Sequence, residues 1–315
     1  MMNERRAKFD LSIVTTIYRT GCYLEEFAQR ALAAAAQSGF APEDVEIVFI
    51  NDGSPDNALN DAVAVRERHP QARVLDMSRN VGHHKAMMTG LRESTGKYVF
   101  LLDSDLEESP EWLIAFKADM DANGYDAVYG VQERRKGKWF ERFSGELFYT
   151  VFNLLAAYKV TPNSVTARLM TRDFVNALIA HEESEPFLFG LAALTGFTQH
   201  PCPVRKKHES PTSYTFIRKF RLACNSILSF SSRPLIYISL LGFLMTCGAF
   251  SYIMWIFLRF ILFGSPPAGW ASLIVSIWFV GGITILCLGI VSLYLAKVFE
   301  EVKRRPYAII KKRYE

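Results

Sequence analysis

The chain has 315 residues, half of them hydrophobic, and a formal net charge of +4 at pH 7. This length is enough for one large domain or two ordinary ones. The small net charge disfavours a nucleic-acid-binding surface, and five scattered cysteines without a CxxC spacing argue against a disulfide framework or a cysteine metal site.

Strands and helices are predicted to alternate through the first third of the chain. Apolar, β-branched runs predict strands at 11–17, 45–54, 72–78 and 97–105. The segments between them predict helices at 23–38, at 56–70 and within 79–96. This alternation predicts an α/β fold with a mostly parallel sheet and helices on both faces.

Polar residues stand at the end of each predicted strand. They are Tyr18, Asn51 with Asp52, Arg79 with Asn80, and Asp103 with Asp105. Ligands of such sheets bind beyond the carboxyl ends of the strands, so this edge is the predicted site. No GxGxxG follows the first strand and no GxxxxGK[ST] occurs, which disfavours a dinucleotide fold and a P-loop.

Asp103 and Asp105 follow an apolar run at positions i and i+2, so their side chains point the same way. Two bare carboxylates raise each other's pKa, whereas a hard cation such as Mg²⁺ or Mn²⁺ relieves their repulsion. The pattern alone also fits an exposed turn before a helix that starts near Pro110, because acidic residues favour a helix N-terminus.

Two later stretches are nearly free of charge and exceed the roughly 20 residues that a membrane-spanning helix needs. They predict transmembrane helices at 235–263 and 270–297, which form a hairpin. Basic residues flank the hairpin on both sides and are absent from its loop. The N-terminal region and a basic tail at 298–315 are therefore expected in the cytoplasm. The charged N-terminus has no apolar segment of the kind found in signal peptides.

Aromatic and basic residues at helical spacing predict interfacial helices at 137–160 and 213–233. An ordinary amphipathic helix against the catalytic core is the alternative. The expected organisation is a cytoplasmic domain at 8–212, anchored to the plasma (inner) membrane by a multi-pass segment. Its partners would include membrane lipids but no nucleic acid.

Four segments in chain order resemble the GT-A (Rossmann-like) fold of the family 2 inverting glycosyltransferases: IVTTIYRTGCYLEEF, VFINDGSPD, DMSRNVGHHKAMMTGL and LLDSDLEESPEW. Three later segments, with the two spans, look like the polyprenyl-phosphate glycosyltransferases: VYGVQERRKGKWFERFSGELFY, NSVTARLMTRDFVNAL and FSSRPLIYISLLG. These are the relatives of dolichol-phosphate mannose synthase and of the bacterial enzymes that charge undecaprenyl phosphate. The resemblance covers nearly the whole chain.

The resemblance implies a role for each matching residue. On the nucleotide side, Tyr18 would pack by the base, Asp52 would contact base or ribose, and Arg79 with Asn80 would form the loop that approaches the nucleotide. Asp103 and Asp105 would contact ribose and hold the metal on the diphosphate, with Asp105 the closer ligand. The remaining matches are Glu107, facing the sugar and acceptor; Arg135, near the acceptor phosphate; Arg168, of the xRL segment; and Lys207, at the diphosphate.

We place Asp105, Glu107, Arg135 and Arg168 in the catalytic group. The reaction that the resemblance implies is transfer of one sugar from a UDP-sugar to undecaprenyl phosphate, with Mg²⁺ or Mn²⁺. Some of the family's enzymes are tetramers, so a homo-oligomer is expected. Thr166 stands where relatives commonly carry an acidic residue, which favours an acceptor phosphate that arrives already anionic, with a second pKa of about 6.

Three alternatives stay open at this point. A polysaccharide synthase is disfavoured because a QxxRW motif and further spans are absent. A membrane-bound nucleotide-sugar sensor or scaffold is an alternative because the family's lysine is replaced by Ser213. The enzyme could also use another lipid or saccharide acceptor. His83 and His84 are interpreted as loop residues near the nucleotide rather than metal ligands, since no third nitrogen ligand has helpful spacing.

Overall fold

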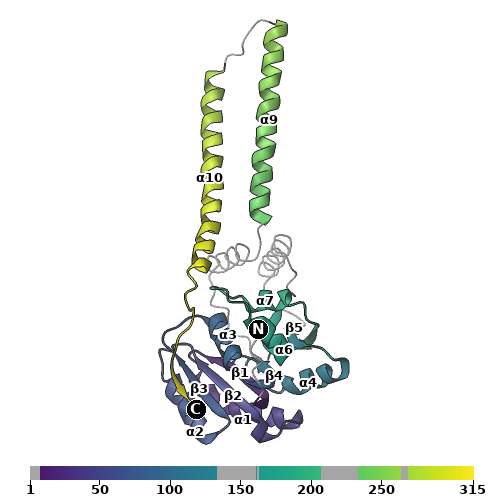
Figure 1. The fold of residues 1–315 in the computed structure, drawn as a ribbon, viewed down its shortest axis with the longest axis vertical. Coiled ribbons are helices and arrows are strands. Elements are labelled where there is room, and N and C mark those ends of the chain that lie inside the picture. The colour runs from purple at the N-terminus through teal and green to yellow at the C-terminus, as the bar shows by residue number, and fades with distance from the viewer. Residues whose placement is uncertain (1–7, 133–160, 162, 207–232, 264–268) are drawn as a thin grey trace. The chain divides into compact units, whose positions relative to one another are not determined.

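The computed structural model describes residues 8–132, 161, 163–206, 233–263 and 269–315. They fall into two compact units. One unit contains an eight-stranded sheet with its helices and residues 305–315, and the other contains two long apolar helices (Figure 1). The predicted interfacial helices at 137–160 and 213–233, apart from the last residue of the second, lie outside the described residues, as do Arg135 and Lys207.

The strands are β1 (Phe9–Ile17), β2 (Val45–Asn51), β3 (Ala72–Met77), β4 (Gly96–Leu101), β5 (Ala127–Gln132), β6 (Ser164–Thr171), β7 (Gln199–Val204) and β8 (Ile310–Tyr314). The helices of the sheet unit are α1 (Leu24–Gln37), α2 (Ala58–Arg68), α3 (His83–Glu93), α4 (Trp112–Asn123), α6 (Arg172–Ile179) and α7 (Leu188–Leu194), with short 3-10 turns at Gly21–Tyr23 and Pro42–Asp44. The strand and helix types predicted up to residue 105 are thus confirmed.

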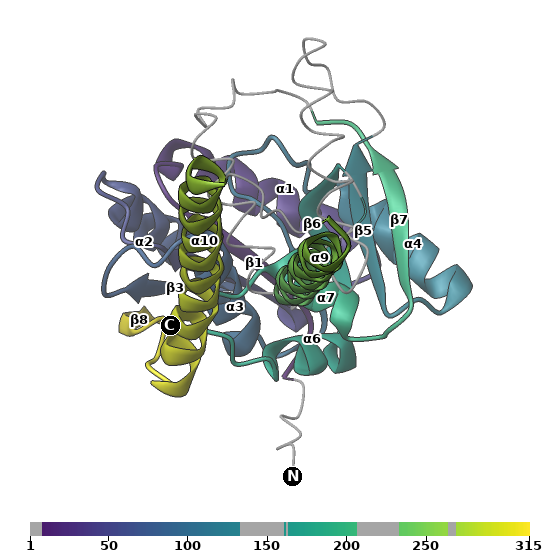
Figure 2. The same cartoon turned by 90° about the horizontal axis from the view of Figure 1, so that it is seen from above.

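The strand order is β7-β5-β6-β4-β1-β2-β3-β8, with β7 and β8 at the two edges (Figure 2). Strands β1 to β4 pair in parallel, as predicted. Beyond β4 the sheet is mixed, because β6 runs antiparallel to both β4 and β5 while β5 and β7 run parallel to each other. The predicted α/β fold with a mostly parallel sheet is therefore confirmed.

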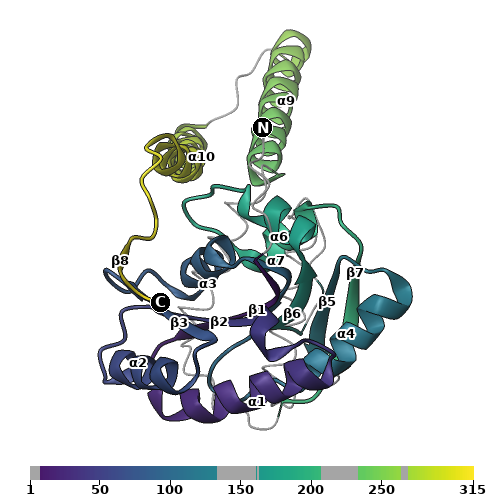
Figure 3. The ribbon, with the colours of Figure 1, turned by 60° about the horizontal axis from the view of Figure 1, so that its bottom comes forward.

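Helices cover both faces of the sheet, with α1, α2 and α4 on one side and α3, α6 and α7 on the other (Figure 3). On the first face, aromatic pairs join helix to strand: the ring centroids of Phe27 and Phe49 lie 6.0 Å apart, and those of Phe100 and Phe116 lie 6.2 Å apart. On the second face, α3 comes close to the sheet at Gly90. A Cβ there would lie 2.6 Å from Val14 Cγ1. The two faces together form the closely packed core that fixes the strand ends in place.

The final strand corrects one sequence-based expectation. Residues 298–315 were assigned to a basic tail, but Ile310–Tyr314 forms β8, antiparallel to β3. An open edge of β3 would expose unpaired backbone groups, and β8 satisfies them. Tyr314 packs against the core, and both guanidinium nitrogens of Arg313 bind the Glu93 carboxylate, at 2.5 and 3.0 Å.

The second unit contains α9 (Arg233–Phe263) and α10 (Trp270–Val302). Apolar stretches at Leu235–Arg259 and Ser276–Val302 are long enough to cross a membrane. Their described side chains are largely exposed, Trp278 for example at 78%. Exposed apolar surface of this extent is suited to contact with lipid. These helices are candidate membrane spans.

Candidate active site

The carboxyl ends of β1, β2 and β4 bring polar side chains to one edge of the sheet. Ser104 donates a hydrogen bond of 2.8 Å to the Thr16 carbonyl, and the Thr20 hydroxyl lies 2.7 Å from Ser104 Oγ. These contacts join the segment after β1 to the segment after β4. Tyr18 lies exposed at the same edge, and the Arg19 guanidinium lies 5.5 Å from its ring centroid.

Asp52 holds the loop between β3 and α3 against the end of β2. Its Oδ1 accepts a hydrogen bond from Val81 N at 2.7 Å, and its Oδ2 accepts one from Asn80 Nδ2 at 3.1 Å. Burial raises the pKa of Asp52 above its ordinary value, although backbone N–H bonds oppose the shift. Gly53 has a φ of +58°, and a Cβ there would lie 2.5 Å from Asn80 N. The loop therefore follows β2 closely and presents Arg79, whose side chain is exposed.

Asp103 follows β4 and faces His83 at the start of α3. His83 Nε2 lies 3.2 Å from Asp103 Oδ1, and its Nδ1 lies 3.1 Å from Thr16 Oγ1. Burial disfavours both charges, but the attraction between the two groups outweighs it, so the pKa of Asp103 is lowered and that of His83 is raised. Asp103 Oδ1 is itself buried and lies against the His83 ring, so this histidine holds the ionised carboxylate at the end of β4.

Asp105 lies next to this carboxylate, and its Oδ1 accepts a hydrogen bond from Glu107 N at 3.0 Å. Burial raises the pKa of Asp105, and the charges of Asp103 and Glu107 raise it further. Each of these causes penalises the negative charge on Asp105. A cation bound between the two aspartates would relieve the penalty.

Glu108, which is buried, pairs with the half-buried Lys206. Glu108 Oε1 accepts a hydrogen bond from Thr166 N at 2.9 Å and lies 3.4 Å from Lys206 Nζ. Lys206 Nζ is also 3.6 Å from Glu107 Oε2. Burial, followed by the charge of Asp103, raises the pKa of Glu108 to about 7. Burial of Lys206 opposes its charge, but the surrounding carboxylates outweigh this and raise its pKa.

The predicted divalent cation fits these residues in part. Asp103 and Asp105 supply oxygen ligands of the kind that Mg²⁺ and Mn²⁺ prefer. No group of three or more His, Cys, Asp or Glu side chains among the described residues could hold a metal ion. A cation held by this pair would thus need further ligands from water or a substrate diphosphate, which is how Mg²⁺ is commonly bound.

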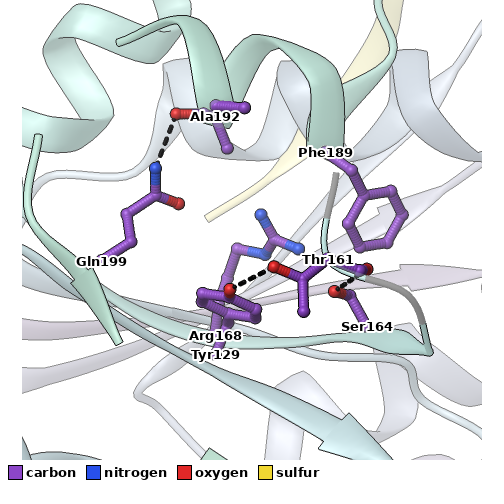
Figure 4. A pocket seen from close by; sticks show the side chains of 8 residues that line it. Tyr129, Thr161, Ser164, Arg168, Phe189, Ala192 and Gln199 are labelled. Carbon is purple, nitrogen blue, oxygen red and sulfur yellow. Dashed lines mark hydrogen bonds between the residues drawn. The ribbon is translucent and has the colours of Figure 1, made fainter. Parts of the chain in front are cut away.

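Arg168 lies within β6 rather than beyond a strand end. It is 3% exposed, and its Nε donates a hydrogen bond of 3.2 Å to the Thr166 carbonyl. Its guanidinium carbon lies 4.7 Å from the ring centroid of Phe189. The guanidinium group lies in the middle of a cavity of about 90 Å³ (Figure 4). The cavity is lined by Tyr129, Thr161, Ser164, Arg168, Phe189, Ala192, Ala193 and Gln199.

The predicted site residues that the structure describes thus occupy two places. Those at the edge are Tyr18, Asp52, Arg79, Asn80, Asp103, Asp105 and Glu107, whereas Arg168 lines the separate cavity. Sequence reasoning missed the role of Glu108 as a buried partner of Lys206. Its position in an acidic stretch before α4 also fits a residue that favours the helix N-terminus from an exposed turn. No local pattern reports that such a side chain turns inward, so the structure was needed to find it.

Residues 12–179 match the family model for glycosyl transferase family 2. A glycosyltransferase of Mycobacterium tuberculosis is 46% identical over 307 residues, which cover 96% of this chain and 88% of that protein. A prophage-derived bactoprenol glucosyl transferase of Shigella flexneri is 32% identical over 276 residues, covering 86% of this chain and 88% of that protein.

Among solved structures, a mannosyltransferase of Pyrobaculum calidifontis in complex with GDP-Man and Mn²⁺ is similar at 15% identity, with a TM-score of 0.47, over 71% of this chain and 64% of that one. This similarity is too distant to bear on function. The family match covers more than half of the chain, and the relatives cover most of it. The chain is a glycosyltransferase and belongs to glycosyl transferase family 2.

Proposed function

We propose that this protein transfers a sugar from a UDP-sugar to polyprenyl phosphate, specifically undecaprenyl phosphate. The observation that carries the proposal is the paired Asp103 and Asp105 at a sheet edge, in a chain that also has two candidate membrane spans. Similarity to a bactoprenol glucosyl transferase supports a lipid acceptor. Because the spans are apolar and their flanks are basic, the domain is proposed to act on the cytoplasmic face of the plasma membrane.

The residues at the sheet edge suggest how the donor is held. Tyr18 and Asp52 lie where the nucleoside would bind, with the loop of Arg79 and Asn80 beside them. Asp103 and Asp105 would hold Mg²⁺ or Mn²⁺, which supplies charge stabilisation for the diphosphate leaving group. Lys206, fixed by Glu107 and Glu108, adds a positive charge at the same edge.

The acceptor phosphate would act as the nucleophile. Its second pKa is about 6, so it carries its negative charge at neutral pH and needs no general base. This agrees with Thr166 at the position where relatives commonly carry an acidic residue. The protein's contribution is then to orient the two substrates and to stabilise charge.

The test is incubation of membranes containing the full chain with a panel of radiolabelled nucleotide sugars and undecaprenyl phosphate. We expect a lipid-linked product that depends on Mg²⁺ or Mn²⁺. The Asp105→Asn variant should lose at least about a hundredfold in rate, the scale seen when one electrostatic contact to a transition state is removed. Asp121→Asn is the matched control, because Asp121 pairs with Lys117 on the surface of α4.

Absence of a lipid-linked product with every donor would contradict the proposal. If nucleotide binding persisted in that case, the protein would be better described as a nucleotide-sugar sensor. A product formed only with a hydroxyl acceptor, such as the free prenol, would contradict the phosphate nucleophile.

A further inference from the structure

The cavity around Arg168 contains a buried positive charge without a matching negative one. Burial lowers the pKa of Arg168 to about 10, so the guanidinium still carries its charge at neutral pH. Its hydrogen bonds go to two backbone carbonyls, those of Thr166 at 3.2 Å and Val165 at 3.5 Å. No carboxylate among the described residues forms an ion pair with it.

Glu108 is the acidic residue whose charge most favours the charged form of Arg168, but it is bound elsewhere. Its Oε1 accepts the hydrogen bond from Thr166 N and faces Lys206. A buried charge is costly unless it is paired. A ligand anion in the cavity would supply the counter-charge that the described residues do not.

The cavity walls carry the donors that such an anion requires. Tyr129 Oη and Thr161 Oγ1 share a hydrogen bond of 2.8 Å, and because each hydroxyl has one proton, one proton is left for another acceptor. Gln199 Nε2 donates a hydrogen bond of 2.8 Å to the Ala192 carbonyl, and its Oε1 is turned toward Arg168 (Figure 4). Figure 4 shows the Arg168 guanidinium between Gln199 and Thr161. A guanidinium fork with a hydroxyl donor beside it matches the tetrahedral oxygens of phosphate.

The register of the sheet places this cavity near the acidic edge. Arg168 on β6 stands opposite Leu101 on β4, so the two side chains lie on the same face. β4 ends at Leu101, and Asp103 follows two residues later and faces His83 at the start of α3, on the same side of the sheet as α7 (Figure 3). An anion bound at Arg168 would therefore lie on the same face of the sheet as Asp103.

We propose that Arg168, Tyr129 and Thr161 form a binding pocket for a phosphate group, separate from the diphosphate site at Asp103 and Asp105. The ligand is a phosphate monoester or inorganic phosphate. Its assignment to the terminal phosphate of the lipid acceptor rests on the proposed function, whereas the pocket itself does not.

The first experiment measures binding without catalysis. The purified full chain in detergent is titrated with inorganic phosphate and, separately, with a short water-soluble prenyl phosphate, and binding is followed by calorimetry. Tyr129→Phe removes one donor and should weaken binding by about tenfold, a typical effect of a hydrogen bond to a charged group. Arg168→Lys keeps the charge but loses the planar fork, and should weaken binding further.

Tyr125→Phe is the matched control, because Tyr125 stacks on His200 with ring centroids 4.6 Å apart and does not line the cavity. It should bind both ligands as the wild type does. Thermal unfolding of each variant without ligand shows whether it is folded, and Tyr129→Phe, which changes one hydroxyl, provides the test if Arg168→Lys does not fold.

The second experiment assigns the ligand. If the pocket holds the acceptor, inorganic phosphate will compete with prenyl phosphate, and Tyr129→Phe will raise the KM for prenyl phosphate about tenfold while the KM for the nucleotide sugar stays within twofold. Binding of inorganic phosphate alone, lost in Tyr129→Phe, supports the pocket with free phosphate as its source. Phosphate affinity that is the same in the wild type, Tyr129→Phe and folded Arg168→Lys would overturn the pocket, even in a protein that transfers sugar as proposed. Absence of transfer with intact, Arg168-dependent phosphate binding would instead count against the proposed function.

Discussion

The two halves of the sheet present their polar groups differently. In the parallel half, β1 to β4, the polar side chains that form the candidate active site follow the strands, as Asp52 and Asp103 do. In the other half, β5 to β7, Arg168 and Tyr129 lie within strands, face each other across the register, and border a cavity. Groups beyond a strand end can exchange water for a cation or a nucleotide. Arg168 in mid-strand is desolvated, so a counter-charge for it would have to enter the cavity.

Removal of divalent metal should give the largest difference between the two halves of the sheet, because sugar transfer and phosphate binding should respond differently. With excess EDTA, transfer should fall by at least about a hundredfold, because the paired acids would repel a diphosphate without an intervening cation. Phosphate binding at the Arg168 pocket should change by less than twofold. The transfer rate is measured by product formation and the phosphate affinity by calorimetry, both on one preparation. Mn²⁺ added afterwards should restore the transfer rate. Full activity in EDTA would show that the acid pair does not act through a metal.

Glu108 lies where the halves meet, and its titration should affect stability. Its pKa of about 7 in the folded chain exceeds the ordinary 4.5, so between these pH values the folded state holds a proton that the unfolded chain has released. The resulting stabilisation is complete below pH 4.5 and is lost as the pH rises through 7. We expect a loss of about 2 kcal/mol between pH 5 and pH 8.

Glu108→Gln keeps an acceptor for Thr166 N but does not titrate, so the pH dependence of its unfolding midpoint should be flatter than that of the wild type. Glu67→Gln is the control, since Glu67 lies on the surface helix α2. Parallel midpoint curves for the wild type and Glu108→Gln would show that Glu108 is charged throughout this range.

Packing on the parallel half can be tested at Gly90. A Cβ there would lie 2.5 Å from Ile50 Cδ1 and 2.6 Å from Val14 Cγ1, so α3 must move outward. Gly90→Ala should cost about 1 to 2 kcal/mol in the free energy of unfolding, although alanine favours helix. Gly124→Ala is a contrasting case, because a Cβ there meets nothing within 4 Å while its φ of +69° disfavours alanine. A more stable Gly90→Ala variant in denaturant unfolding would mean that the contact relaxes without cost.

The smallest effect is expected at the β8 edge. Arg313 and Glu93 form a partly exposed ion pair, and Arg313→Ala should lower the free energy of unfolding by roughly 0.5 kcal/mol. Increasing the salt concentration should shrink the difference from the wild type, since salt screens exposed charges. Lys311→Ala serves as the control, because Lys311 is exposed on the same strand. A loss of unfolding free energy several times larger would indicate that the ion pair of Arg313 and Glu93 is the main interaction that holds β8 on the sheet.

Much of the parallel half could be predicted from sequence because its signals are local. Apolar runs, the glycine after α1 and the polar residue that ends each strand all lie within short segments. The same reasoning assigned residues 310–314 to a tail, because a strand that pairs with β3 from the far end of the chain has no local signal of its own. The inward turn of Glu108 was not predicted for a similar reason: a carboxylate near a helix start is usually solvated, and only packing against Thr166 and Lys206 turns this one inward.

By itself, the sequence determined the α/β class, the acidic strand end at Asp103 and Asp105, and the two long apolar helices, since each depends on spacing or composition within a single segment. The tertiary structure decided which distant residues share an environment. It placed His83 against Asp103, fixed Lys206 between Glu107 and Glu108, and left Arg168 buried beside Tyr129 and Gln199. The physical reason is that burial and charge pairing depend on contacts between segments far apart in the chain, and no local pattern encodes them.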